Sequence, residues 1–145
     1  MSPPRQEWPY DTPYGPGTYP ELRLGSGPRH LGLFSAFLLF WLVLEMVNHG
    51  GGTIPLGIAG LFTPDLTLFV GPSGSHEAGQ LPRGRVPGYN LVHRPVVPLL
   101  WLAVCVVLPD PPGTALFTFG IAWLLHIALD RALGYGLRTV DGWQR

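Results

Sequence analysis

The chain has one cysteine, no lysine and few charged residues, and each of these shortages argues against a structural feature or a class of protein. Cys105 has no second cysteine with which to form an intrachain disulfide. The nine basic residues are all arginines and are scattered, so no basic cluster indicates a nucleic-acid partner. Charged residues make up only 12% of the chain, which leaves too few for the outward polar stripes of a soluble helical bundle.

Hydrophobic residues, 46% of the chain, gather in four blocks at about residues 31–48, 54–70, 92–108 and 114–134. Each block is long enough to cross the hydrocarbon core of a bilayer as an α helix. Residues 99–108 have no polar side that could face water. We therefore expect an all-α fold, a four-helix transmembrane bundle, within one membrane domain at residues 31–145.

Residues 1–30 have a different composition from the rest of the chain. They are rich in proline and glycine and hold too few apolar side chains to offset the entropy lost on ordering. This composition predicts a flexible, Pro-rich N-terminal tail, and it leaves open whether the tail recruits a partner.

Prolines interrupt two of the blocks. Pro64 removes an amide donor from the second block and so predicts a kink near Gly60. Pro95 fits best in the first turn of a helix, which places His93 and Arg94 at the entrance of the third block.

The distribution of arginine predicts which way the blocks run. The loops near residues 49–53 and 109–113 contain no basic residue. All nine arginines lie in the tail, in or just after the long connection at 71–90, or at the end of the chain: Arg5, Arg23, Arg29, Arg83, Arg85, Arg94, Arg131, Arg138 and Arg145. By the positive-inside rule, both termini and the long connection are cytoplasmic. We expect a multi-pass protein of a bacterial-type inner or plasma membrane.

Polar residues within these blocks are costly to place in a membrane unless they pair or line a wet cavity. With the predicted topology, four of them share one depth in the cytoplasmic half: Asp65, His93, His126 and Asp130. His126 and Asp130 are also four residues apart, and therefore share a helix face. Glu45 and His49 belong to the opposite face of the membrane and are excluded from this cluster.

Two imidazoles and two carboxylates suit a divalent metal ion such as zinc, manganese or iron. Such an ion lowers the pKa of a bound water and supplies a nucleophile near neutral pH. Arg94 or Arg131 would then stabilise an anionic group such as a phosphate. This pattern predicts a metal-dependent hydrolase acting on a phosphorylated or lipid substrate.

Two other interpretations need no metal. In the first, Asp130 pairs with Arg94 or Arg131 and Asp65 with a histidine, so that a structural lock holds the helices in register. In the second, the polar residues form a proton or ion path, although four short helices enclose little space unless the chain forms a homo-oligomer. The sequence leaves all three open.

Several motifs resemble a known family: PDL at residues 64–66, YNLVHR at 89–94, AWLLHIALDRALGYGLR at 122–138 and DGWQR at 141–145. Together they resemble the small membrane proteins grouped as domain of unknown function 4260, over about residues 29–145. That family has no established activity, so the resemblance bears on the fold more than on the function.

A looser resemblance is to the membrane proteins of the YdjM type, which are grouped as metal-dependent hydrolases. It implies that Asp65, His93, His126 and Asp130 are metal ligands. The chain departs from that pattern, because no Asp-His pair follows Asp65 and Pro95 follows the His-Arg pair. Fewer ligands imply one metal ion at most.

Overall fold

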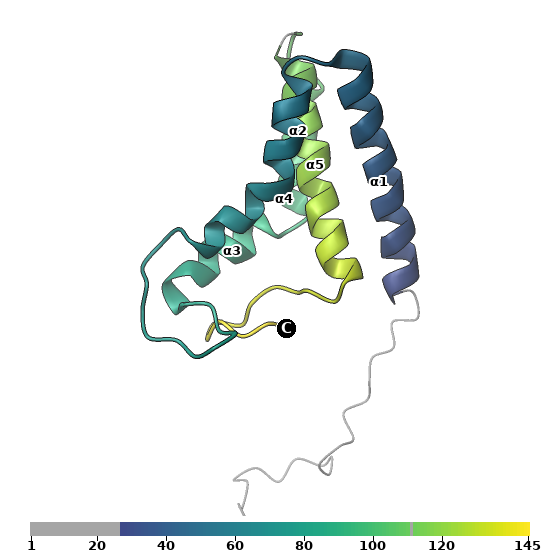
Figure 1. The fold of residues 1–145 in the computed structure, drawn as a ribbon. Helices are drawn as coiled ribbons and strands as arrows, with labels where there is room; N and C mark the ends of the chain where they lie inside the picture. The colour runs from purple at the N-terminus through teal and green to yellow at the C-terminus, as the bar shows by residue number, and fades with distance from the viewer. Residues whose placement is uncertain (1–26, 111) are drawn as a thin grey trace, which may run out of the picture.

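The part of the chain that the structure describes is helical. The computed structural model describes residues 27–110 and 112–145. Within them lie five α helices and two short 3₁₀ helices, η1 and η2 (Figure 1): α1 Gly27–His49, α2 Thr53–Phe62, η1 Pro64–Leu68, η2 Arg83–Arg85, α3 Val86–Val92, α4 Val96–Cys105 and α5 Gly113–Ala132. The β pairing among these residues is limited to an isolated bridge between Arg138 and Gln144. The prediction of an all-α fold is confirmed for the described residues.

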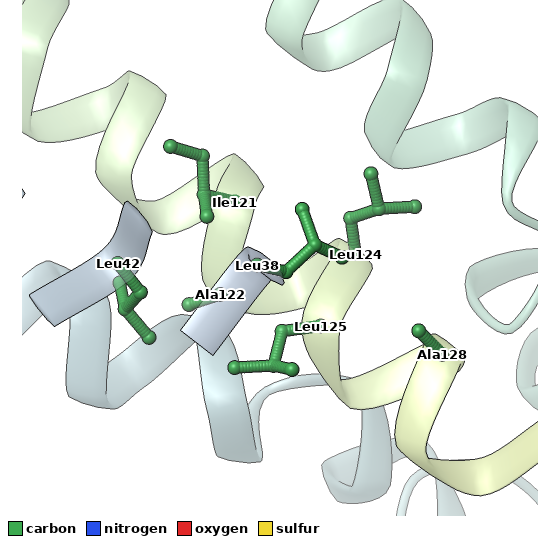
Figure 2. Packing of buried hydrophobic residues seen from close by; sticks show 7 residues of the cluster. All are labelled: Leu38, Leu42, Ile121, Ala122, Leu124, Leu125 and Ala128. Carbon is green, nitrogen blue, oxygen red and sulfur yellow. The ribbon is translucent and has the colours of Figure 1, made fainter. Parts of the chain in front are cut away.

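Helix α5 is the central element, and α1, α2 and α4 all pack against it (Figure 1). Apolar side chains of α1 and α5 form the main core between these two helices (Figure 2): Leu38, Leu42, Ile121, Ala122, Leu124, Leu125 and Ala128. Removing these side chains from solvent is the main force that orders the helices. The core therefore fixes the rotation of α5, and with it the direction in which its polar residues point.

Two glycines bring α5 unusually close to its neighbours. A Cβ atom on Gly60 of α2 would lie 2.8 Å from the Cβ atom of Ala122, closer than real Cβ atoms pack. A Cβ atom on Gly120 of α5 would lie 2.7 Å from side-chain atoms of both Trp101 and Leu102 in α4. Both helices can approach α5 this closely only because no side chain intervenes.

Among the residues that the structure describes, two helices are long and apolar enough to cross a membrane by length and composition. They are residues 29–49 of α1 and the 20 residues of α5, which at 1.5 Å per residue is about 30 Å of helix. Residues 53–68 and 96–105 form shorter apolar helical segments. Much of the apolar surface is open: Phe40 of α1 is 65% exposed and Leu100 of α4 is 63% exposed.

The helix boundaries differ from the sequence-based blocks at three places. Helix α1 begins at Gly27, inside the predicted tail, because Pro28 is well tolerated in a first helical turn. The remainder of that tail, residues 1–26, lies outside the described residues. In the second block, α2 ends at Phe62 and the chain continues from Pro64 as η1, while Gly60, the predicted kink position, lies inside α2.

The third block falls on two helices, α3 and α4, rather than on one. The interruption covers residues 93–95. Pro95 has no amide hydrogen to donate and disfavours a helical conformation at Arg94. His93 therefore ends α3 and lies in the break, instead of entering a continuous helix as the sequence suggested.

Candidate metal centre

The four predicted ligands come together from three segments of the chain. Asp65 lies in the first turn of η1, and His93 follows the last residue of α3. His126 and Asp130 lie one turn apart in the C-terminal half of α5. Both histidines lie within 3.7 Å of both carboxylates, measured from Nε2 to the nearest oxygen.

One donor atom from each of Asp65, His93 and His126 lies within 4.8 Å of the other two, which suits a single small cation; Asp130 is not part of that set. The two Nε2 atoms are 3.4 Å apart. Asp65 Oδ1 lies 3.6 Å from Nε2 of His93 and 3.5 Å from Nε2 of His126. Asp130 Oδ2 lies 3.7 and 3.5 Å from the same two nitrogens. Two ligands of a tetrahedral zinc ion, with bonds of about 2.0–2.2 Å, stand about 3.3–3.5 Å apart.

The hydrogen bonding of His93 directs a lone pair into this cluster. Its Nδ1 atom lies 2.9 Å from the carbonyl oxygen of Tyr89. A carbonyl oxygen only accepts, so Nδ1 carries the hydrogen, and the Nε2 atom of the neutral ring carries a lone pair. That lone pair faces the carboxylate oxygens of Asp65 and Asp130. Acceptors that converge in this way require a cation or a proton between them. A carbonyl partner on the other ring nitrogen, here Nδ1, is typical of a metal-bound histidine.

Neighbouring side chains hold the two rings in place. The Tyr89 ring stacks on the His93 ring, with centroids 3.8 Å apart and an interplanar angle of 20°. Trp123 Nε1 donates to the carbonyl oxygen of Val92, 2.9 Å away, and so joins α5 to the end of α3 immediately before His93. The His126 ring stands at 63° to that of His93, so both Nε2 atoms can point at one position.

Burial within the cluster is uneven. The His93 and His126 side chains are 2% and 12% exposed, and that of Asp130 is 24% exposed. The Asp65 side chain is 49% exposed. A ligand or solvent molecule therefore reaches the cluster from the side of Asp65.

The two predicted anion-stabilising arginines have different surroundings. Arg131 donates from Nη2 to the carbonyl oxygen of His93 and from Nη1 to that of Tyr135, both at 3.3 Å. Arg94 is exposed. Within residues 27–110 and 112–145, neither arginine forms an ion pair with Asp65 or Asp130. The Arg–Asp pairs of the structural-lock interpretation are thus not formed in this part of the chain.

Sequence reasoning did not single out Tyr89, Asn90 or Arg138 as parts of the site. Tyr89 is four residues before His93, so helical spacing alone could have indicated that its carbonyl faces the imidazole. Nothing in the sequence indicates that Asn90 contacts Arg138, which is 48 residues further on.

A second polar group lies near the other end of α5. Glu45 Oε2 is 3.4 Å from His49 Nε2, and Trp41 Nε1 donates to Glu45 Oε1 at 2.9 Å. With Asp110 and neighbouring residues, this pair lines a pocket of about 290 Å³. The hydroxyl and amide of Thr114 donate to Asp110 and hold its pKa below the ordinary value. These residues are remote from His126 and Asp130, as the sequence predicted.

The fold and the cluster together define a class: small helical proteins with helices of membrane-spanning length and a partly buried His/Asp cluster that could hold a metal ion. The chain belongs to the family described as domain of unknown function DUF4260, whose profile matches residues 31–145. The family resemblance drawn from the motifs is thereby confirmed. No curated protein and no solved structure matches the chain. The looser resemblance to the YdjM type stays a prediction.

Proposed function

We propose that this chain is a four-span membrane protein that holds one divalent metal ion at its cytoplasmic side and uses it to hydrolyse a phosphorylated or lipid substrate. The observation that carries this proposal is the convergence of the His93 and His126 Nε2 atoms with the carboxylates of Asp65 and Asp130. These four donors must share a cation or a proton, and their spacing suits a metal ion.

Helix length and exposed apolar surface both support a location in the lipid bilayer. Helices α1 and α5 are long enough to span, and we assign the two further crossings of a domain at 31–145 to the shorter apolar helical segments at residues 53–68 and 96–105 with the turns beside them. Large apolar side chains cover the outer surfaces of α1 and α4, among them Phe40 and Leu100. In water such surface would be an aggregation liability, whereas in lipid it is the natural exterior.

The arginines support placing the termini and the 71–85 loop in the cytoplasm. In the sequence, no arginine falls in the 49–53 or 109–113 connections, whereas Arg83 and Arg85 lie in the long loop and Arg138 and Arg145 near the C-terminus. The metal site would then open to the cytoplasm, where the exposed Arg94 would bind the anionic part of a substrate. Arg131 could join it only by giving up its hydrogen bonds to the carbonyls of His93 and Tyr135.

Sidedness is tested by cysteine labelling in a Cys105→Ser background. A membrane-impermeant maleimide is expected to label Asn48→Cys in intact cells and Gly74→Cys only after permeabilisation. Asn48 is the penultimate residue of α1, at the proposed outer face, and Gly74 lies in the long loop, where an added Cβ meets no atom within 4 Å. Labelling of Gly74→Cys in intact cells, with Asn48→Cys protected, would reverse the topology.

The donor set favours zinc, manganese or iron(II), because imidazole nitrogen and carboxylate oxygen together suit these ions. Asp65, His93 and His126 as three ligands would leave a coordination position open, and the half-exposed side of Asp65 is where water or substrate would enter. A bound ion supplies a water of lowered pKa and polarises the oxygen under attack. The protein residues would orient that chemistry: the Tyr89 carbonyl and ring hold His93 in place, and Arg94 would face an incoming anion from the exposed surface.

A structural lock is the second candidate, and one observation favours it. The cluster joins three segments distant in sequence, namely η1, the α3–α4 break and α5. With a proton in place of the metal ion, the same four side chains would form a hydrogen-bond network that joins the helices. A proton or ion path would need additional chains to enclose it.

Hydrolysis is tested with detergent-purified protein loaded with zinc, manganese or iron(II). We expect metal-dependent cleavage of a chromogenic phosphoester or of phospholipid in vesicles. Asp65→Asn should lower it at least about 100-fold, because a neutral amide is a poor ligand. Glu77→Gln, which removes an exposed carboxylate from the loop, should leave the rate unchanged. Cleavage that is insensitive to chelators, or no cleavage by metal-loaded protein, would contradict the hydrolase proposal.

A further inference from the structure

Beyond α5 the chain turns back and runs beneath α3 (Figure 1). We call residues 133–145 the C-terminal strap. Its far end is fixed to the loop that precedes α3. Leu81 N donates to the carbonyl oxygen of Gly142 at 2.9 Å, and Arg83 forms a 2.5 Å ion pair with Asp141. Gly142 has φ of +93°, and a Cβ atom there would meet the backbone of Leu81, so this contact requires glycine.

The middle of the strap is joined to α3 by a two-point contact. Asn90 Nδ2 donates to the carbonyl oxygen of Arg138 at 2.9 Å. The amide nitrogen of Arg138 donates to Asn90 Oδ1 at 2.7 Å. One carboxamide thus satisfies both backbone groups of a single strap residue, which needs a donor and an acceptor on the same side chain. The contact fixes Arg138 beside Tyr89, the residue preceding Asn90.

Arg138 and His93 both contact the Tyr89 side chain. The guanidinium carbon of Arg138 lies 5.6 Å from the centroid of the Tyr89 ring, within the range of a cation–π interaction. The same ring stacks on His93 at 3.8 Å, and the Tyr89 carbonyl accepts from His93 Nδ1. Arg138 Nη1 donates to the carbonyl oxygen of Gly79 at 3.2 Å, which holds the guanidinium in place.

These contacts form one continuous path from the strap to a predicted ligand. We infer that Asn90 and Arg138 are positioning residues, which hold Tyr89 against His93 and so orient its Nε2 atom toward Asp65, His126 and Asp130. The metal part of this inference rests on the proposed function. Neither residue touches the cluster, so their effect on it passes through Tyr89.

The consequence is a loss of metal affinity without loss of a ligand. Partners that orient a metal-bound histidine typically contribute 10- to 100-fold in affinity. Arg138→Ala and Asn90→Ala should therefore weaken metal binding by about that factor. Arg138→Lys, which keeps a cation near the Tyr89 ring, should restore part of it.

The test is cobalt(II) titration of the full-length protein in detergent, followed by the visible spectrum. Arg145→Ala is the matched control, since Arg145 lies exposed on the same strap. We expect weaker binding and an altered band intensity for Arg138→Ala and Asn90→Ala, and parental behaviour for Arg145→Ala. A purely structural strap would lower the melting temperature but leave the affinity and spectrum of the folded protein unchanged, and that result would overturn the inference.

A second measurement keeps this inference separate from the proposed function. If the parent protein binds no cobalt, the metal proposal fails. The positioning role of Asn90 and Arg138 is then tested by itself, with ¹⁵N NMR of the histidine rings. We expect the metal-free parent to hold His93 with hydrogen on Nδ1, and Arg138→Ala to lose that fixed tautomer. An identical His93 signal in the parent and in Arg138→Ala would overturn the inference.

Discussion

Replacing His126 by alanine is expected to remove the bound metal from the purified protein while leaving its abundance and helical content nearly unchanged. The His126 side chain supplies one of four donors and lies 3.4–3.5 Å from the other three ligand atoms. Loss of a ligand should exceed the 10- to 100-fold effect of losing an outer partner, so affinity should fall at least about 100-fold. Elemental analysis of parent and variant protein after gel filtration measures the effect.

Two comparisons make that result specific. His93→Ala should lose the metal as well, whereas His76→Ala should keep it, because His76 is exposed in the long loop and contacts Gly74 instead of the cluster. A structural lock gives a different pattern: the parent would carry no metal, and His126→Ala would lower abundance or thermal stability. Metal retained in both cluster variants would place the ion elsewhere.

Replacing Leu100 by lysine is expected to deplete the protein from the membrane fraction and to lower its thermal stability. Leu100 is 63% exposed near the middle of α4. A charge at the centre of a spanning helix opposes insertion by about 2.5–3.5 kcal/mol, which is roughly a 100-fold change in that equilibrium. At an exposed position in water, the same substitution would change stability by only about 0.5 kcal/mol.

Gly74→Lys is the matched control for Leu100→Lys. It adds the same charge in the exposed loop, where nothing lies within 4 Å of an added Cβ atom. We expect its abundance in membranes to equal that of the parent. Quantitative immunoblotting of membrane and soluble fractions gives the comparison, and parental amounts of Leu100→Lys in the membrane would argue against α4 as a lipid-facing span.

Two features could be predicted from the sequence for a physical reason: the all-α class of the fold and the residues that make up the His/Asp cluster. If the hydrophobic blocks span a membrane, they constrain the depth of every residue within them, and the arginine distribution predicts their direction. Asp65, His93 and His126 could thus be assigned to one depth without any knowledge of packing. The structure brings their side chains within 3.6 Å of one another.

The sequence did not indicate where the third block breaks. A proline is compatible both with the first turn of a helix and with an interruption between two helices. The choice at Pro95 depends on how α3 packs beneath the bundle, which is a tertiary effect. The break places His93 directly after α3, where its Nδ1 atom keeps the i−4 carbonyl of Tyr89 as its partner.

The strap could not have been predicted from sequence either. It pairs residues 79–90 with residues 138–143, two polar stretches without hydrophobic periodicity. Their contacts are backbone hydrogen bonds, a carboxamide pair and an arginine over a ring, none of which leaves a pattern in one sequence. The DGWQR motif marked the segment as distinctive, but its contact with α3 comes from the structure alone.

X-ray absorption spectroscopy at the zinc edge of zinc-loaded protein tests the metal centre most directly. We predict one zinc ion per chain, with two imidazole nitrogens at about 2.0–2.1 Å and carboxylate oxygens at about 2.0–2.2 Å. His93→Ala, treated in the same way, should retain no zinc. Protein that retains no zinc after gel filtration, or a zinc shell without imidazole, would contradict the assignment of Asp65, His93, His126 and Asp130 as a metal site.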